Sequence, residues 1–192
     1  MGNREDLLVG AKRCLFEKGY SRTTARDVAT AAGVSLAAIG YHFGSKEALL
    51  NTAMIESIGS WGDVVEKAVA EAVPEGASPR ERFVATWDCV RGTMIEYQGL
   101  WAAQFEALAR LDDMHEIRDA FRAVQRDARL GMATMFSELA EVPDTEDEVM
   151  VGAFHQALLA GLVSQWLIDP SQSLTGAEVL RGLELTGARV LG

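Results

Sequence analysis

The chain has 192 residues, 48% of them hydrophobic, so it can bury a core and does not have the composition of a disordered protein. Its net charge of -10 is unevenly spread: residues 1–50 hold seven basic and five acidic side chains, and the remainder holds eleven basic and 23 acidic ones. The net charge is therefore +2 for residues 1–50 and -12 for the remainder. This asymmetry favours an N-terminal segment that faces a polyanion. Cys14 and Cys89 show no metal-ligand spacing, and we expect two core thiols in a reducing compartment.

Every periodic stretch has a helical period, so we predict an all-α fold of about nine helices without a sheet. The first helix spans about 4–18 and has one apolar stripe: Leu7, Leu8, Ala11, Cys14 and Leu15. Thr24 and Asp27 form a capping-box pattern for the second helix. Ser35 and Ser45 can cap the third and the fourth. Because residues 1–6 lead straight into a helix, we expect no signal peptide and a cytoplasmic protein.

The clearest break in the first half is AVPEGASPRE at 72–81, where Ser78 and Glu81 form the capping box of a fifth helix. A sixth helix follows Gly99. The seventh is expected at about 114–141, capped by Asp113 and Glu116 and with Leu139 on its inward stripe. Capping patterns also open the eighth and ninth helices, at Thr145–Glu148 and Thr175–Glu178. We predict two domains, residues 1–50 and residues 51–192.

The second and third helices have the spacing of a helix-turn-helix. The first helix of this motif needs a small residue where the second crosses it. The turn needs a residue that tolerates positive φ four places later, and the second helix needs an apolar anchor about ten places after the small residue. Ala29, Gly33 and Ile39 meet these three demands. A plain helical hairpin in a core is the alternative, but the full set between two capping signals favours the helix-turn-helix.

Residues 7–50, LLVGAKRCLFEKGYSRTTARDVATAAGVSLAAIGYHFGSKEALL, resemble the TetR family of bacterial transcriptional regulators. The motifs that carry this resemblance are EKGY, TARDVA, AGVS, YHF and GSKEAL; near the other end, ALLAGLVSQWLIDP resembles the penultimate helix of many members. The resemblance implies a three-helix DNA-binding head on a helical ligand-binding and dimerisation domain. It also implies a ligand-responsive regulator, most simply a repressor that binds a palindromic operator as a homodimer and is released by a small apolar or amphipathic molecule. Activation in place of repression stays open.

The resemblance places the reading helix after Ser35 and makes double-stranded operator DNA the expected partner. We expect Ala37, Ala38 and Gly40 to face outward, because small side chains let a helix approach base edges closely. Leu36 stands where the family often has Lys, which removes one donor to phosphate or base. The expected DNA contacts are Thr24, Ser35, Leu36, Ala37, Ala38, Tyr41, His42 and Lys46. Tyr41 and His42 could instead pack under the first helix.

The run 149–168 is apolar almost all round, although His155, Gln156, Ser164 and Gln165 interrupt it. We therefore favour a helix buried on more than one side over a membrane span. One chain of this size supplies one buried side, and a second copy can supply the other. A wholly intramolecular central helix is the alternative. The expected dimer interface comprises Ala153, Ala157, Ala160, Gly161, Ser164, Val179, Leu183 and Val190.

Aromatic and Met side chains recur on the inward stripes of several helices, which is typical of a core and also of an adaptable ligand pocket. The expected ligand contacts are Trp61, Phe83, Trp87, Met94, Trp101, Phe105, Phe121, Met132, Met135 and Trp166. Glu96 and Glu106 lie near this set; they could favour a cationic ligand or simply be solvated.

Catalytic patterns are missing from the sequence. His42, His115 and His155 lie far apart, and no G-x-S-x-G, phosphate loop or dinucleotide fingerprint occurs. We therefore expect no enzyme, no metal and no cofactor. The alternative function is an all-α small-molecule-binding or adaptor protein without sequence-specific DNA binding.

Overall fold

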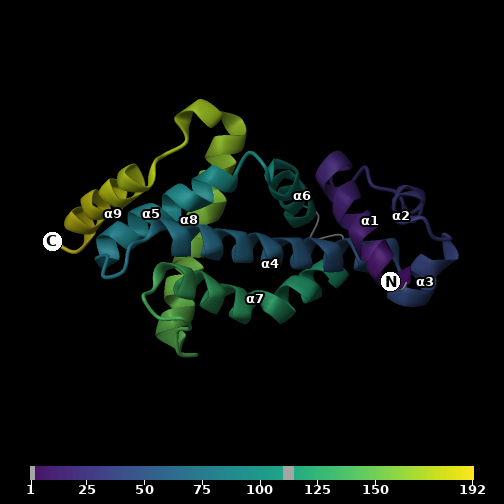
Figure 1. Cartoon of the computed structure of the whole chain (residues 1–192), viewed down its shortest axis with the longest axis horizontal. Helices are drawn as coiled ribbons and strands as arrows, with labels where there is room; N and C mark the ends of the chain where they lie inside the picture. Colours follow the sequence, from purple (N-terminus) through teal and green to yellow (C-terminus); the bar gives the residue numbers. More distant parts are fainter. Residues whose placement is uncertain (1–2, 110–114) are drawn as a thin grey trace. The chain divides into compact units, whose positions relative to one another are not determined.

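The computed structural model describes residues 3–109 and 115–192, and these residues form nine α-helices and no strand (Figure 1). The helices are α1 (Asn3–Lys18), α2 (Ala25–Ala32), α3 (Ala37–Phe43), α4 (Lys46–Ala72), α5 (Pro79–Thr93), α6 (Gln98–Leu108), α7 (His115–Phe136), α8 (Glu146–Ile168) and α9 (Gly176–Val190). The predicted all-α fold of about nine helices is confirmed.

Packing divides the chain into two compact units. Unit 1 comprises Met1–Trp61 and Glu96–Val124, and unit 2 comprises Gly62–Ile95 and Gln125–Gly192. Helix α6 therefore belongs to the same unit as α1, α2 and α3, although it is far from them in the sequence. This grouping describes packing, and the proposed functional boundary between residues 50 and 51 stays a prediction.

The capping residues fix where most helices begin, as the sequence indicates. The Thr24 hydroxyl accepts a hydrogen bond from the backbone N–H of Asp27, and its backbone N–H donates to the Asp27 carboxylate. Ser78 with Glu81 and Thr175 with Glu178 form the same reciprocal box. Such pairs satisfy amides that the first turn of a helix leaves without partners. Single side-chain caps at Ser45 and Thr145 open α4 and α8.

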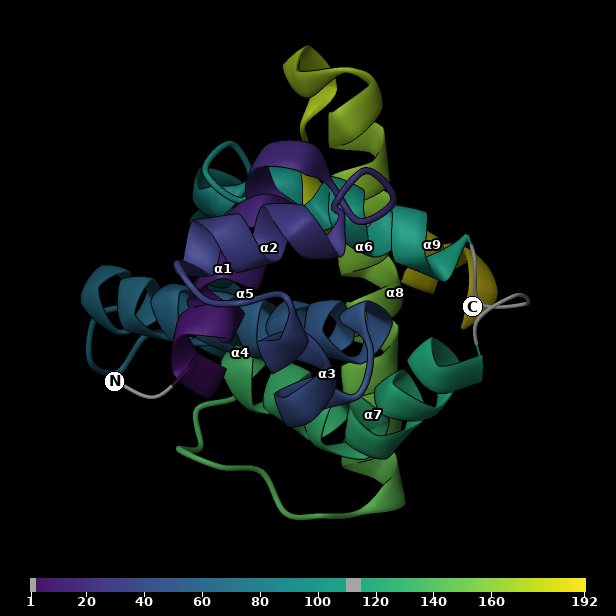
Figure 2. The ribbon, with the colours of Figure 1, turned by 90° about the vertical axis from the view of Figure 1, so that its right-hand side faces the viewer.

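Within unit 1, α1 is packed at backbone distance on two sides. A Cβ added to Gly10 would lie 2.9 Å from the amide nitrogen of Ala32 in α2, and one added to Gly99 would lie 2.4 Å from the carbonyl oxygen of Phe16. The second contact joins α6 to α1 close to the end of α1. Figure 2 views this unit with α2 and α3 toward the reader. Helix α6 is therefore a structural part of the unit that carries α3.

Two glycines allow the helices of unit 2 to pack closely. A Cβ added to Gly152 of α8 would lie 1.8 Å from the carbonyl oxygen of Arg129 in α7. A Cβ added to Gly176 would lie 2.1 Å from the carbonyl oxygen of Val84. The Gly176 backbone N–H also donates to Asp88 Oδ1 at 2.9 Å, which joins the start of α9 to α5.

Helix α8 buries one face in unit 2 and exposes an apolar face. The buried residues are Val149, Gly152, His155, Leu159, Val163 and Trp166. The exposed apolar stripe comprises Met150, Phe154, Ala157, Gly161 and Ile168. Among the described residues, α8 is long and apolar enough to cross a membrane by length and composition, but one such helix is weak evidence for a membrane span. The single chain thus buries one face of α8, and the burial of a second face against another copy stays a prediction.

The connection between α7 and α8 differs from the prediction. Helix α7 ends at Phe136 and not near residue 141, and Leu139, predicted to face inward, is 56% exposed. The chain turns back because Thr134 Oγ1 accepts a hydrogen bond from the backbone N–H of buried Val142. The predicted cap of α7 at Asp113 and Glu116 includes residues outside the described ones. A short 3₁₀ turn at Pro170–Gln172, which was not predicted, follows α8.

We expect Gly152→Ala to lower the free energy of unfolding by roughly 1–3 kcal/mol or more, because the new methyl group would overlap the backbone of α7. Gly131→Ala is the matched control: Gly131 lies on α7 with nothing within 4 Å of a Cβ, and this change should stabilise the helix by roughly 0.5–1 kcal/mol. Urea unfolding of both variants measures the difference. Equal stability of the two would contradict the close crossing of α7 and α8.

Candidate functional site

The turn between α2 and α3 has the geometry that the sequence predicts for a helix-turn-helix. Ala29 is 6% exposed and Ile39 4% exposed, so both pack in the head. Gly33 ends α2 in the left-handed conformation, with φ at 67°. The backbone N–H of Val34 closes the turn on the Ala29 carbonyl at 3.1 Å. Glycine is favoured at this position because a Cβ would strain the left-handed backbone.

Helix α3 presents a mostly uncharged surface. Tyr41 is 86% exposed and its ring packs edge-on against His42, with ring centroids 4.8 Å apart. Leu36 is 49% exposed, and Ala37 and Gly40 are exposed as well. This surface holds apolar groups and a phenol, which suit contacts with thymine methyl groups and with phosphate.

Two expectations about α3 are wrong. Ala38, predicted to face outward, is only 8% exposed and shares the buried side of α3 with Ile39. A helix of two turns has room for one inward face, and residues 38 and 39 both fall on it. Ser35 does not cap α3, because the N-cap position is Leu36, without a side-chain hydrogen bond. The Ser35 side chain is exposed.

The hydroxyl of Thr24 is used within the head. It donates to Asp27 Oδ2 at 2.7 Å, and Lys18 Nζ approaches Asp27 Oδ1 at 2.6 Å. The hydrogen bond from Lys18, followed by those from Thr24, holds the pKa of Asp27 well below its usual value. Asp27 therefore stays ionised throughout the physiological range. Thr24 is exposed, but any contact with DNA shares its hydroxyl with the cap.

Lys46 joins the start of α4 to the turn after α1. Its ammonium donates to the Thr23 carbonyl at 3.2 Å and lies 3.2 Å from the Glu47 carboxylate. The side chain is 25% exposed, so a phosphate contact would have to compete with both partners. The role of Lys46 in DNA binding stays a prediction.

Most basic side chains of the head form ion pairs, but among the described residues two arginines near the start of α2 do not. Lys12 pairs with Glu56, and Arg13 pairs with Glu17. Arg22 and Arg26 are exposed and form no ion pair within the part of the chain that the structure describes. The Nε of Arg22 donates to the Lys18 carbonyl. Both arginines are candidates for phosphate contacts that the sequence analysis missed, although the net charge of residues 1–50 could have indicated them.

Together, the closed turn at Gly33, the exposed face of α3 and the unpaired arginines define a helix-turn-helix DNA-binding head. Comparison with known proteins agrees. Residues 7–53 match the family model described as bacterial regulatory proteins, tetR family. The head of this chain, residues 7–53, is therefore similar to the tetR family of bacterial regulatory proteins.

Relatives with an assigned role are regulators. The HTH-type transcriptional regulator TtgR of Pseudomonas putida is 24% identical over 180 residues, which cover 87% of this chain and 81% of TtgR. The HTH-type transcriptional repressor AcnR of Corynebacterium glutamicum is 36% identical over 90 residues, which cover 46% of this chain and 47% of AcnR. The stronger identity therefore falls on a segment under half of the chain.

Solved structures share the fold. A putative TetR-family regulator from Rhodococcus sp. superposes with a TM-score of 0.68 at 21% identity, covering 96% of this chain and 98% of the other. The multidrug binding protein EbrR, solved in complex with imidazole, gives 0.68 at 22% identity and 95% coverage of both chains.

The ten predicted ligand contacts are divided between the two units. Unit 1 holds Trp61, Trp101, Phe105 and Phe121, and unit 2 holds Phe83, Trp87, Met94, Met132, Met135 and Trp166. Trp61 and Trp101 form an edge-to-face pair with centroids 4.8 Å apart. Glu106 of α6 does not lie free beside them: its carboxylate accepts a hydrogen bond from the backbone N–H of Ser21 at 2.9 Å. A common ligand site for all ten residues stays a prediction.

A cluster of four rings lies inside unit 2. Phe136 has ring centroids 4.1 Å from His155 and 5.0 Å from Trp87, and Phe83 lies within 6.3 Å of Trp87 and 6.2 Å of His155. Trp87 is 2% and His155 8% exposed. We call these four residues the ring cluster. The sequence analysis included Phe83 and Trp87 but missed Phe136 and His155.

Two polar atoms of the ring cluster have no hydrogen-bond partner. These are the indole Nε1 of Trp87 and Nδ1 of His155. Burial lowers the pKa of His155 to about 4, although a hydrogen bond with the Met132 backbone acts in the opposite direction. Each unpartnered buried group costs on the order of 1–3 kcal/mol. The ring cluster therefore keeps two unfavourable groups in the core of unit 2.

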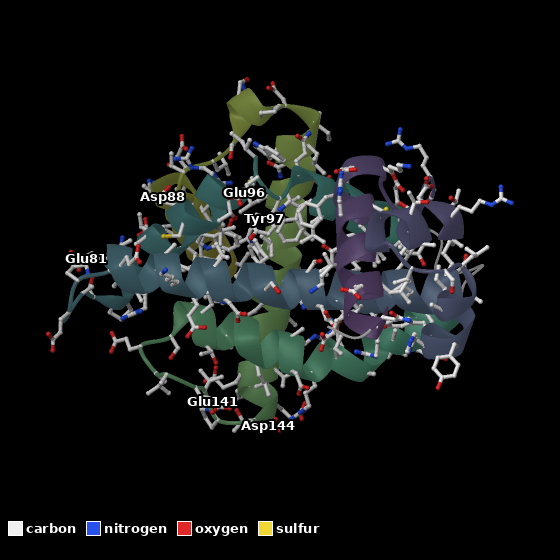
Figure 3. The ribbon with its side chains drawn as sticks, turned by 45° about the vertical axis from the view of Figure 1, so that its right-hand side comes forward. Glu81, Asp88, Glu96, Tyr97, Glu141 and Asp144 are labelled. Atoms are coloured by element: carbon white, nitrogen blue, oxygen red, sulfur yellow. The ribbon has the colours of Figure 1, made fainter. Side chains whose placement is uncertain are left out.

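Two hollows of unit 2 are too small or too open to be a preformed effector pocket. A cavity of about 10 Å³ lies among Trp87, Arg91, Met94, Leu162, Gln165, Gln172, Ser173, Leu174 and Val179, and it has room for about one water molecule. A wide, shallow groove runs between α5 and α9 beside Glu81 and Asp88, which Figure 3 labels on α5. Neither of these two hollows encloses enough space for a drug-sized ligand.

Most of the predicted dimer residues are accessible in the single chain. Ala157, Ala160, Gly161, Leu183 and Val190 are exposed, and Ala153 and Ser164 are half-buried. Val179 is 5% exposed and lines the small cavity, so its assignment to a partner-facing surface is wrong. The first turn of α9, which carries Val179, packs on α5.

We expect Ala37→Glu to abolish DNA binding with the fold intact, because the carboxylate would face the phosphates from an exposed site. Ala38→Glu should instead unfold the head, because it places a charge on the buried side of α3. Circular dichroism and fluorescence anisotropy with duplex DNA measure folding and binding. An Ala37→Glu protein that binds as tightly as the unaltered protein would show that α3 does not face DNA.

Acid should destabilise unit 2 through His155. The pKa of its folded form, about 4, lies below the ordinary value of 6.5, so the unfolded chain binds the extra proton as the pH falls. The free energy of unfolding should therefore be independent of His155 protonation above pH 6.5. Between pH 6.5 and 4 it should fall by on the order of 3 kcal/mol. Urea unfolding at pH 7 and pH 5 tests this. His155→Phe should lose less stability over this interval than the unaltered protein and than the control His42→Asn.

Proposed function

We propose that this chain is a ligand-responsive transcriptional regulator that binds operator DNA through α3. The observation that carries the proposal is the helix-turn-helix closed at Gly33, with Tyr41 and Ala37 exposed on its second helix. The matching relatives TtgR and AcnR are transcriptional regulators, and AcnR is a repressor. We infer repression as the mode of action and the cytoplasm as the site of action. We propose no catalytic role.

A homodimer is the proposed binding form. The exposed stripe of α8 offers apolar and small side chains at helical spacing, including Phe154, Ala157 and Gly161. Water contact along such a stripe is unfavourable, and a second copy would bury both stripes at once. Two heads related by a two-fold axis read a palindrome. The symmetry of the proposed operator thus follows from the proposed interface.

A small molecule is the proposed signal. EbrR, which shares the fold, was solved with imidazole and is described as a multidrug binding protein. In this chain α6 offers a route from effector to head, because Gly99 contacts the Phe16 backbone and Glu106 binds the loop after α1. A shift of α6 would therefore move α1. Coupling must be reciprocal, so operator DNA should weaken effector binding as much as effector weakens DNA binding.

Binding to DNA from the region flanking its own coding sequence tests the proposal. We expect the logarithm of affinity to fall linearly with the logarithm of salt concentration, and Arg26→Ala to reduce the slope by about one unit. Arg126→Ala is the control; this arginine pairs with Asp144 in unit 2 and should leave the slope unchanged. Salt-independent retention, or none, would favour the alternative of an all-α small-molecule-binding protein that does not read DNA.

Light scattering in the same experiment decides the assembly. The unaltered protein should scatter with twice the mass of a single chain. Gly161→Glu should give single chains with weak binding, because the interface would bury two unpaired carboxylates. Gly131→Glu places the same charge on an exposed part of α7 and should stay dimeric. A dimeric Gly161→Glu protein would refute the interface.

A further inference from the structure

Two of the unpartnered buried polar atoms of unit 2 belong to rings that contact the same phenyl ring. Phe136 contacts His155 on one side and Trp87 on another, with centroids 4.1 Å and 5.0 Å apart. Phe83 closes the group, with its centroid 5.6 Å from that of Phe136. The ring of Phe136 therefore occupies the middle of a site with aromatic walls.

The phenyl ring of Phe136 lies between Trp87 and His155 but can form no hydrogen bond with either side chain. The indole N–H of Trp87 can only donate, and Nδ1 of a neutral His155 accepts when the other nitrogen carries the proton. Both side chains are more than nine-tenths buried, and buried groups of this kind are nearly always hydrogen-bonded. A hydrocarbon ring can do neither, whereas a hydroxyl group can accept from Trp87 and donate to His155.

Phe136 is also the member of the ring cluster that is best placed to leave. It is the last residue of α7 and is half-buried. The irregular segment 137–145 follows it, and Figure 3 labels Glu141 and Asp144 there. The hydrogen bond that closes this segment, from Val142 N–H to Thr134 Oγ1, is long at 3.3 Å. Withdrawal of Phe136 needs a movement at a helix end and leaves the crossing at Gly152 in place.

The polarity of the site favours a neutral ligand. Burial keeps His155 uncharged near neutral pH. Arg82 and Arg129, on α5 and α7, each bury an Nε without a partner, so an anionic ring is the competing class that a test must include. An ammonium group would find no acidic side chain among the four rings.

We propose that a neutral hydroxylated aromatic molecule displaces Phe136 and binds among Phe83, Trp87 and His155. Its hydroxyl group bonds both Trp87 Nε1 and His155 Nδ1. This inference deepens the effector role proposed above and rests on it. In the absence of ligand, the ring of Phe136 occupies the position of the ligand.

Three probes of one shape test this. They are p-cresol, which has the hydroxyl; toluene, which lacks it; and p-toluate, which carries a negative charge. We would titrate each into the ¹⁵N-labelled full chain and follow the indole N–H signals, with Trp87 assigned by Trp87→Phe. We expect p-cresol to shift the Trp87 signal and to bind at least about tenfold more tightly than either other probe, because a site with unpaired polar groups rejects a ligand that leaves them unpaired.

Phe136→Ala vacates the ring's place and should raise the affinity for p-cresol about tenfold or more. The matched control is Ile95→Ala, which removes an apolar side chain of the same unit that is 78% exposed, and it should leave the affinity unchanged. Should Phe136→Ala fail to fold, the titration of the unaltered chain decides alone.

Three results would overturn the inference: toluene binding as tightly as p-cresol, p-toluate binding more tightly, or a Trp87 signal that stays in place up to the solubility limit of p-cresol. The titration contains no DNA, so its failure is separate from a failure of the DNA-binding experiment, which would refute the regulator itself.

Discussion

The close packing of α1 is the constraint on which the head depends. Gly10 lets α1 touch the backbone of α2, and Gly99 lets α6 touch the backbone of α1. Contacts between backbones leave no soft side chain to absorb a displacement, because packed interiors have few voids. The position of α3 is therefore set through α1 and α2. The contact between Gly99 and the Phe16 backbone is therefore the link through which the proposed effector signal would reach the head.

Local signals in the sequence predicted the fold well because they act locally. A capping box such as Thr24 with Asp27 needs only four residues, and its geometry in the structure is the one expected. The left-handed turn at Gly33 is equally local. The burial of Ala38 could not be predicted from local signals, because it depends on how a two-turn helix packs against α1 and α2. A short helix gives too few positions to tell its inward side from its outward one.

The site residues that the sequence analysis missed lie in segments where the hydrophobic pattern does not distinguish a buried side from an exposed one. Helix α8 is apolar almost all round, so its sequence cannot distinguish the buried side that holds His155 from the exposed side that holds Phe154. Phe136 was missed because the seventh helix was expected to continue to about residue 141. Glu106 was read as part of the ligand region, whereas a hydrogen bond across 85 positions of sequence joins it to Ser21. Such long-range contacts leave no periodic trace.

Gly99, Gly152 and Gly176 have a consequence for the genetics of this protein. Any single-base change in a glycine codon that alters the product introduces a side chain or stops translation, so these three codons have no conservative missense neighbour. Each codon specifies a contact with the backbone of another helix that excludes even a methyl group. In a selection for escape from regulation, substitutions here would be recovered as loss-of-function alleles although none of the three residues lies on α3. Gly131 and Gly182, with open space around them, would be nearly absent from the same collection.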